Sequence, residues 1–340
     1  MNGINRRHVL KTMAAGAAAL GLFSIRTRPA EAAEFTYKLG TAWPSEHPSS
    51  VEAKATCDRI KEATGGRVEI GFFPNNMLGG DTDMLSQTRS GALEFMFVPT
   101  GVLSTFLPVA SINNVGFAFN DYDQVWKAMD GGLGAHVRAQ ITKSGLVVMD
   151  KIWDNGFRQL TTGARPINAL ADLKGMKIRV PVSPIFTSMM SALGASPASA
   201  NVNELYSALQ TKVFDGQENP LTNIQSWKLY EVQKFCALTS HMWEGYWLIG
   251  NRRAFSRMPA DLQTTANRIF NEGAERQRLK LADVTASLQK SLENLGMTFT
   301  TPDRAPFRDA LAKAGFYEHW RKQFGDEAWS QLEAVSGKLA

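Results

Sequence analysis

The chain has 340 residues, of which 44% are hydrophobic and 20% are charged, and its formal net charge is +5. Residues 1–32 hold five cationic side chains against one glutamate, Glu31, so only about +1 belongs to the rest of the chain. A nearly neutral body lacks the broad basic field that holds nucleic acid, and no later segment reaches the roughly 18 apolar residues of a membrane-spanning helix. Composition therefore argues against a nucleic-acid-binding or membrane-embedded protein.

The N-terminal segment has the three parts of an export signal. Asn5-Arg6-Arg7-His8 opens a twin-arginine pattern, an alanine-rich apolar run follows over 13–25, and Ala30-Glu31-Ala32 offers small residues at the cleavage spacing. We expect residues 1–32 to be a twin-arginine signal peptide and the mature chain to begin at Ala33 in the periplasm. An uncleaved anchor or an organelle presequence is the alternative.

Beyond this segment, strand patterns alternate with helical spacing, which is typical of an α/β fold. The last long stretch, 259–296, contains few helix breakers and predicts a helix that is too long for one lobe. The predicted strands are 35–41, 68–73, 95–98, 147–153, 177–180 and 213–218, and the predicted helices are 49–64, 81–90, 121–129, 133–143, 184–193, 202–210 and 259–296.

About 308 residues remain after the signal peptide, more than one hydrophobic core usually holds, which predicts two lobes. The two cysteines, Cys57 and Cys236, are 179 residues apart. The periplasm would permit a disulfide between them, but the pattern favours two buried free thiols.

The sequence contains no recognisable catalytic or cofactor motif. It lacks His-Glu-x-x-His, Gly-x-Ser-x-Gly, Cys-x-x-Cys and a phosphate-binding glycine loop, and its histidines are widely scattered. We therefore expect no catalytic residue, no metal site and no cofactor, and a binding protein rather than an enzyme.

Two blocks near the middle of the chain are the most informative. Gly175-Met-Lys-Ile-Arg-Val-Pro181 places Arg179 inside an apolar strand, and Asp215-Gly-Gln-Glu-Asn-Pro220 ends a second strand. A guanidinium group keeps its charge and presents a fork of donors that matches a carboxylate. From periodicity alone, Arg179 is equally well a surface arginine beside a turn, since Pro181 suits an edge strand.

These blocks resemble those of the substrate-binding proteins of tripartite ATP-independent periplasmic (TRAP) transporters of the DctP type. The similarity covers nearly all of the chain after residue 32 and includes Gln-Thr-Arg-Ser-Gly-Ala-Leu-Glu-Phe at 87–95 and Asn-Gly-Phe-Arg-Gln-Leu at 155–160. Several blocks in one order are far more specific than one short motif. The resemblance implies a two-lobe α/β binding protein with parallel-rich sheets, hinge strands and a long lobe-spanning helix.

The same resemblance implies a domain division and a function. Lobe one would hold 33–156 plus 246–284, and lobe two 157–245 plus 285–340, with hinge strands near Asn155 and Gly245. Such a protein captures an organic acid through its carboxylate, closes over it and delivers it to the permease subunits of the transporter. The alternatives are a solute-binding protein of an ABC importer, a ligand-binding partner of a signalling receptor and a periplasmic enzyme.

The resemblance also implies a set of ligand contacts. Arg179 matches the arginine that pairs with the ligand carboxylate, and Asn219 matches the asparagine that bonds the same group. Arg158 matches a second arginine of the cleft. The remaining expected contacts, from segments that line the cleft in relatives, are His241, Trp43, Trp153 and Trp243.

Each of these residues other than Arg179 also has a structural interpretation. Asn219 would satisfy a turn before Pro220, and Arg158 would form a salt bridge in the hinge region. His241 would be a hydrogen-bonded structural histidine, and the tryptophans would be ordinary packing between lobes.

Departures from the family pattern reduce the range of possible ligands. Ala42 and Pro99 stand where members similar to the sialic-acid binders carry an asparagine and a glutamate. The Asp-Ala-x-Glu-Trp block of the 2-oxoacid and lactate binders is replaced by Asp-Gly-Gln-Glu-Asn-Pro. A C4-dicarboxylate, a sugar acid or an aromatic acid remains, and the sequence names neither the ligand nor the oligomeric state.

Overall fold

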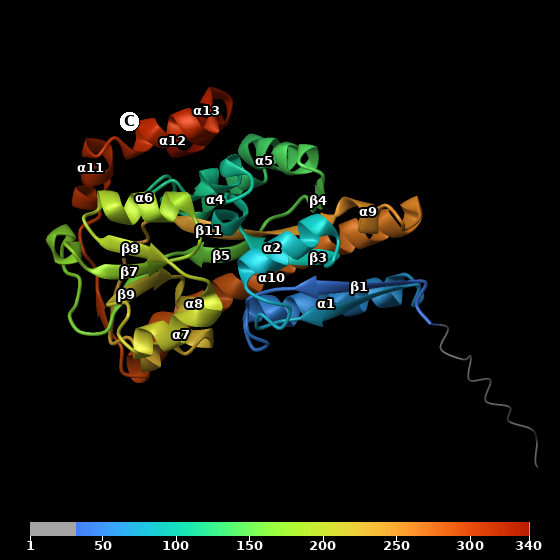
Figure 1. Cartoon of the computed structure of the whole chain (residues 1–340), viewed down its shortest axis with the longest axis horizontal. Helices are drawn as coiled ribbons and strands as arrows, with labels where there is room; N and C mark the ends of the chain where they lie inside the picture. Colours follow the sequence, from blue (N-terminus) through green and yellow to red (C-terminus); the bar gives the residue numbers. More distant parts are fainter. Residues whose placement is uncertain (1–31, 340) are drawn as a thin grey trace, which may run out of the picture. The chain divides into compact units, whose positions relative to one another are not determined.

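Two mixed β-sheets organise the chain (Figure 1). The computed structural model describes residues 32–339, in which strands and helices alternate as the α/β prediction requires. The predicted signal peptide, apart from Ala32, lies outside the described residues. We call the two six-stranded sheets sheet A and sheet B.

Sheet A has the strand order β2-β1-β3-β11-β4, and β5 also pairs with β11. β1 runs parallel to β2 and β3, whereas β11 is antiparallel to β3, β4 and β5. All nine residues of β11 are buried, because both faces of this central strand are covered. The strands are β1 Phe35–Gly40, β2 Val68–Phe73, β3 Phe95–Pro99, β4 Leu146–Val148, β5 Trp153–Phe157 and β11 Trp243–Asn251.

Sheet B has the strand order β12-β10-β6-β9-β7-β8. β7 is parallel to both β8 and β9, and β6 is antiparallel to β9 and β10. The register sets Arg179 opposite Gln217, so the ends of β7 and β9 that carry Arg179 and Asn219 lie at the same edge of the sheet. The strands are β6 Gln159–Thr162, β7 Lys177–Val180, β8 Ser196–Ser199, β9 Gly216–Asn219, β10 Phe235–Ala237 and β12 Thr298–Thr300.

The helices connect and cover these strands, and their ends follow capping chemistry. In α1 the His47 Nδ1 atom accepts a hydrogen bond from Ser49 N, and Pro48 occupies the first turn. α2 ends at Gly91, whose φ of 91° is the left-handed conformation of a helix C-cap. The helices are α1 Pro48–Ala63, α2 Asp81–Ser90, α3 Thr100–Leu103, α4 Tyr122–Met129, α5 Gly132–Lys143, α6 Pro184–Ala192, α7 Val202–Gln210, α8 Leu221–Ser226, α9 Arg252–Phe255, α10 Ala260–Asn294, α11 Ala305–Lys313, α12 Phe316–Phe324 and α13 Asp326–Ser336, with short 3₁₀ turns η1 Pro108–Asn114, η2 Leu170–Leu173 and η3 Leu229–Glu231.

The long helix predicted at 259–296 is confirmed as α10, which has 35 residues. It packs on α1 and β5, which belong to the sheet A side, and on α8 and β12, which belong to the sheet B side. Figure 1 shows it in orange and red, passing behind both groups of strands. One rigid element therefore contacts both sheets.

The predicted strand 147–153 is wrong as a single element. The chain forms β4 and β5 instead, and both pair with β11 at different points along it. The charged residues Asp150 and Lys151 lie between them, where Lys151 N bonds Asn271 of α10. The predicted strand 213–218 begins only at Gly216, because Lys212 takes a left-handed turn with φ of 59°.

The chain passes between the two sheets at three points within residues 32–339. Arg158 links β5 to β6, residues 238–242 link β10 to β11, and α10 leads from β11 and α9 to β12. The C-terminal helices α11–α13 then pack on α6 and also on α4, α5 and η1. The lobe boundaries inferred from the resemblance stay a prediction, since residues 33–340 group together as one unit.

The hydrophobic core also extends across both sheets. One cluster contains Met96 and Val98 of β3 together with Ile178 and Val180 of β7. A second lies between sheet A, α1 and α10, and a third lies around α7, α8 and β10. Both cysteines are buried free thiols, Cys57 in α1 and Cys236 in β10.

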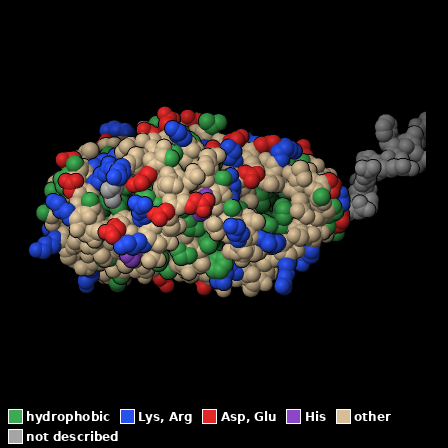
Figure 2. Space-filling view, turned by 90° about the horizontal axis from the view of Figure 1, so that it is seen from above, with side chains coloured by type: hydrophobic (Ala, Val, Ile, Leu, Met, Phe, Trp, Pro, Cys, Tyr) green, Lys and Arg blue, Asp and Glu red, His purple; other side chains and the backbone are tan. Residues whose placement is uncertain are grey.

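The described surface carries charges of both signs. On the face shown in Figure 2, Lys and Arg side chains are interspersed with Asp and Glu, and no field of one sign covers it. None of the helices within residues 32–339 combines the length and the apolar character that crossing a membrane requires.

A buried carboxylate joins α1 to α10. Glu52 is fully buried, and its oxygens accept bonds from Arg59, Arg276 and Lys280 at 2.6–2.8 Å. The two helices are close because Gly273 lies against Thr56, where any side chain would collide. Burial acts to raise the pKa of Glu52, but the three cations outweigh it and the pKa is lowered.

We predict that Glu52→Gln lowers the free energy of unfolding by about 1–3 kcal/mol at pH 7, because three cations lose a buried acceptor charge. A carboxyl with a lowered folded pKa contributes stability above its unfolded pKa and loses it as the pH falls through the folded value. Wild type and variant should therefore converge below about pH 4. Urea denaturation across pH measures this.

The matched control is Glu69→Gln, which removes an exposed carboxylate paired with Lys61 at 2.8 Å. It should leave the free energy of unfolding nearly unchanged, because water replaces the exposed partner. Equal losses for the two variants would contradict the role of Glu52.

Candidate ligand-binding site

Arg179 is a buried cation without a carboxylate partner. It lies in β7 with 2% of its surface exposed, and its Nε and Nη2 atoms donate to Ala200 O. No ion pair joins it to an Asp or Glu among residues 32–339. Burial lowers the pKa of Arg179 to about 10, which still leaves the group charged at neutral pH. A buried unpaired charge is costly, so this position favours an anionic guest.

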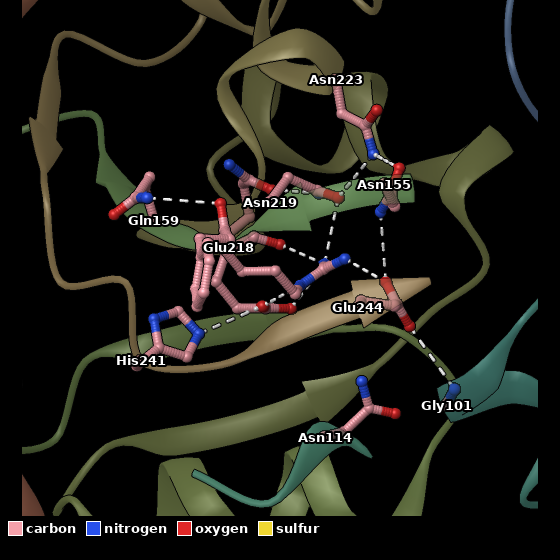
Figure 3. A network of polar contacts seen from close by, with 12 residues as sticks. Gly101, Asn114, Asn155, Gln159, Glu218, Asn219, Asn223, His241 and Glu244 are labelled. Carbon is pink, nitrogen blue, oxygen red and sulfur yellow. Dashed lines mark hydrogen bonds and ion pairs between the residues drawn. The ribbon is translucent and has the colours of Figure 1, made fainter. Parts of the chain in front are cut away.

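Arg158, by contrast, is saturated by two carboxylates of the chain itself, Glu218 and Glu244, which Figure 3 labels. Its guanidinium forms ion pairs with Glu218 of β9 and Glu244 of β11, and Nη2 donates to Glu218 O at 2.6 Å. All three side chains are at most 2% exposed. Burial alone would lower the pKa of Arg158, but the two carboxylates outweigh it and raise it. The predicted ligand contact at Arg158 stays a prediction, and the geometry shows a cross-link between the sheets.

Asn219 ends β9 and lies within a chain of buried amides. Its Oδ1 accepts a bond from Arg158 Nη2 at 3.0 Å, and its Nδ2 donates to Gln217. Asn223 of α8 extends the chain by donating to Asn155 Oδ1 at 3.1 Å, and Asn155 donates to Glu244 Oε2 at 3.3 Å. Figure 3 shows these amides bridging the two sheets.

Asn155 reaches this position because of an irregularity in the β5–β11 ladder. The register shifts between Glu244 and Gly245, which pair with Gly156 and Asp154, so Asn155 has no partner residue in β11. Such bulges redirect side chains. Gly245 itself must be a glycine, since a Cβ there would lie 2.5 Å from the ring of Trp243.

His241 is fully buried beside the ion-pair cluster. Its Nδ1 lies 2.8 Å from Thr239 Oγ1 and its Nε2 lies 3.3 Å from Glu218 Oε2. Burial lowers the pKa of His241 although Glu218 opposes the shift, so the imidazole is neutral at pH 7. In this geometry it orients Glu218, and its predicted contact with a ligand stays a prediction.

The three predicted tryptophans occupy different surroundings. Trp43 stacks on Tyr246, with ring centroids 4.2 Å apart, and its Nε1 donates to Asn155. Trp153 packs edge-on against Phe97 in the second core cluster. Trp243 packs on Trp126 and donates to Asp154 Oδ1 at 2.8 Å. Of the three rings, Trp43 is the one that stacks on Tyr246, whose hydroxyl is influenced by the charges of Asp81 and Arg179.

Two polar residues near Arg179 were missed by the sequence interpretation. Asp81, the first residue of α2, is 5% exposed, and its Oδ1 has no hydrogen-bond partner within the described chain. Burial raises the pKa of Asp81 to about 7, with Arg179 opposing the shift and Glu244 adding to it. Tyr246 is 3% exposed, and burial raises the pKa of its hydroxyl, which also responds to Asp81, Glu244, Arg158 and Arg179.

A sequence signal existed for both. Glu244 and Tyr246 occur two residues apart in the apolar run of β11, so they lie on one face of the strand. A charged residue in such a run is unusual and marks a polar site. Asp81 follows Gly79-Gly80 at a helix start. This pattern is equally typical of an acidic residue that only stabilises the first turn of a helix.

The edges of the two sheets meet around this site. His47 Nε2 lies 3.0 Å from Asn223 Oδ1, Asn201 Nδ2 donates to Thr82 Oγ1 at 3.0 Å, and the hydroxyls of Ser104 and Ser183 are 3.4 Å apart. A hollow of about 340 Å³ lies along this seam, between residues 44–46 and 75–76 on one side and α7 and α8 on the other. Arg179, Asp81 and Tyr246 lie outside its lining and are covered.

We predict that Asp81→Asn stabilises the ligand-free protein. Because the folded pKa of Asp81 is near 7, ionising the buried carboxyl costs free energy that grows from about pH 4 to pH 7 and is constant above. The variant should gain up to about 4 kcal/mol of unfolding free energy at pH 8 and almost none at pH 4.

Urea denaturation at the two pH values provides the measurement. Asp83→Asn is the control, because Asp83 is exposed in the same helical turn and its Oδ2 accepts a bond from Gly80 N that an asparagine oxygen retains. A destabilised Asp81→Asn protein at pH 8 would show that the carboxylate is already matched by an unseen partner.

Comparison with known proteins identifies the family. Residues 39–322 match the family described as bacterial extracellular solute-binding protein, family 7. The chain is 35% identical over 310 residues to an uncharacterised protein of Sinorhizobium fredii, of whose length it spans 57%. It is 30% identical over 295 residues to the 2,3-diketo-L-gulonate-binding periplasmic protein of Escherichia coli, covering 86% of this chain and 88% of that protein.

Solved structures of similar fold contain bound organic acids. A TRAP periplasmic solute binding protein of a Polaromonas species, bound to D-erythronate, superposes with a TM-score of 0.85 at 30% identity and covers 89% of this chain and 100% of its own. One from Sulfurospirillum deleyianum, with bound succinate, gives a TM-score of 0.84 at 28% identity, covering 89% of this chain and 99% of its own.

Proposed function

Because this chain belongs to the family 7 bacterial extracellular solute-binding proteins and is a TRAP solute-binding protein, we propose that it captures an organic acid by its carboxylate at Arg179. The identification made from the sequence blocks is thereby confirmed. The protein acts in the periplasm after export by the twin-arginine route, delivers its guest to the permease subunits of a membrane transporter and catalyses no reaction.

The main support for this proposal is that the charge of Arg179 has no carboxylate partner in the described chain. Its guanidinium is buried and bonded on one side to Ala200 O, while no carboxylate of the described chain pairs with it. An incoming carboxylate supplies the missing charge, and charge-assisted bonds of this kind are worth roughly 1.5–3 kcal/mol each. Two such bonds and buried apolar area are sufficient for micromolar binding, which corresponds to about 8 kcal/mol.

The ligands of similar proteins support this assignment. Succinate, D-erythronate and 2,3-diketo-L-gulonate differ in length and polarity, but each carries a carboxylate. These ligands belong to three different proteins of similar fold or sequence, and the group they share is the one that a common cation would recognise. Arg179 is the described cation that is free to do so, since Arg158 is engaged by Glu218 and Glu244.

The other predicted residues take supporting roles in the proposal. Asn219 bonds the guest carboxylate from the neighbouring strand end and is kept in place by Arg158. The stacked pair Trp43 and Tyr246 forms the wall against which the body of the guest packs. His241 orients Glu218, and Trp153 and Trp243 pack the hinge region and contribute shape rather than direct contacts.

Capture requires the seam between the sheets to open. We assign the hinge to the strands near Asn155 and Gly245, where the ladder is irregular and Arg158 joins the two sheets. The structure described here has its seam contacts formed, so Arg179 is covered. Opening separates those contacts, and closure over a guest excludes water and strengthens the ion pair.

We predict that Arg179→Ala abolishes binding of the cognate acid and that Arg179→Lys weakens it at least about 100-fold. Lysine keeps the charge but cannot present two parallel donors to a carboxylate. A thermal-shift screen of organic acids would first identify a ligand, because a tight binder raises apparent stability. Isothermal titration calorimetry then compares the variants.

The control is Arg253→Ala, which removes an exposed arginine at the start of α9 and should leave the affinity unchanged. Thermal unfolding without ligand establishes that each variant is folded. Wild-type affinity in both Arg179 variants would refute the assignment of the carboxylate site.

A further inference from the structure

A second buried carboxyl lies close to the arginine that receives the guest. The loop after β8 places them together, because Ala200 O accepts bonds from Arg179 while the next residue, Asn201, lies against Gly80 and bonds Thr82. Asp81 stands between these two contacts at the start of α2. It is 95% buried and its Oδ1 has no partner among the described residues.

Glu244 adds a third carboxyl to this region. It is 1% exposed, and its Oε1 lies 3.4 Å from the amide of Gly101. Arg158 is its cationic partner, but Arg158 also neutralises Glu218. One arginine therefore serves two carboxylates, and the charge of Glu244 still acts on Asp81 and on the hydroxyl of Tyr246.

The balance of these charges restricts what can enter. The buried charged groups that act on one another around Arg179 are two arginines, Arg158 and Arg179, and three carboxyls, Asp81, Glu218 and Glu244. With all of them ionised, the site is negative by one charge before any guest arrives. A guest carboxylate fits beside Arg179, but a second carboxylate on the same guest would be buried without any cation to receive it.

We propose that Asp81 and Glu244 make this a site for monocarboxylates whose far end carries a hydrogen-bond donor such as a hydroxyl group, and that they exclude dicarboxylates. The inference rests on the proposed function and narrows its ligand class. The unpartnered Asp81 Oδ1 accepts the donor, which satisfies a buried oxygen that otherwise has no bond. Hydroxylated acids of the sugar-acid type meet both requirements.

A dependence on pH follows from the same arrangement. The charges of Arg179 on β7 and Glu244 on β11 act on Asp81, and the charge of Asp81 acts on Tyr246 of β11; Arg158 and Glu218 act in turn on Arg179. A guest carboxylate adds a negative charge and favours the protonated form of Asp81. Affinity therefore falls as the pH rises through about 7, and binding near neutral pH is accompanied by uptake of a proton.

The test uses pairs of acids of equal length that differ only at the far end. Each pair joins a monoacid ending in a primary alcohol to the diacid of the same carbon number: 4-hydroxybutanoate with succinate, erythronate with the corresponding tartrate, gluconate with glucarate. A thermal-shift screen on the mature wild-type protein finds the best pair, and calorimetry measures both affinities. We expect the monoacid to bind at least about 30-fold more tightly than its diacid.

Asp81→Asn identifies the cause of this preference. Asparagine keeps an acceptor oxygen for the hydroxyl but removes the charge, so the monoacid retains most of its affinity and the ratio between the pair falls at least about fivefold. The fall in affinity between pH 6 and pH 8 becomes smaller, as does proton uptake measured in buffers of different ionisation enthalpy. Asp83→Asn, which removes an exposed charge in the same turn, leaves the ratio unchanged.

Each outcome decides the matter. A diacid that binds as tightly as its monoacid overturns the inference and leaves the proposed function intact, and so does an unchanged ratio in Asp81→Asn. Failure of every acid to bind overturns the proposed function and the inference together. A preferred monoacid with a ratio that collapses only in Asp81→Asn supports both.

Discussion

Taking charge out of water costs more than ordinary hydrogen bonds return, and around its candidate site this chain buries Arg158 and Arg179 together with the carboxyl groups of Asp81, Glu218 and Glu244. Arg158 is matched twice, by Glu218 and Glu244, whereas Arg179 is matched by no described carboxylate. Asn219 accepts a further bond from Arg158, Asn155 donates to Glu244, and Asn223 donates to both of these asparagines. We propose that the carboxylate of the ligand pairs with Arg179.

Different residues therefore stabilise the fold and recognise the ligand. The pair formed by Arg158 and Glu244 crosses from one sheet to the other, so it holds the scaffold whether or not a ligand is present. The charges of Asp81 and Arg179 destabilise the folded protein unless a ligand group compensates them, because both side chains are buried and incompletely bonded. Sites of this kind lower the stability of the empty protein in exchange for specificity.

Much of the fold could be predicted from local patterns, and the predicted bounds of α2, β2, β7 and α7 match the observed ones. β11 could not, since Gly245 and Gly250 interrupt its pattern and its pairing partners are far away in the sequence. The importance of Arg179 came from resemblance to known blocks. Its isolation and the nearness of Asp81 depend on a loop contact through Ala200 and Asn201 that no short-range pattern encodes.

The location of Arg158 has a mechanical consequence. It is the single residue between β5 and β6, where the chain crosses from sheet A to sheet B. Rotation displaces atoms in proportion to their distance from the axis, so ion pairs centred on a crossing point are hardly stretched when the halves swing. The buried ion pairs of Arg158 would therefore persist when the proposed hinge opens, while contacts between the sheets that lie away from the crossing point, such as that of Asn201 with Thr82, break and reform.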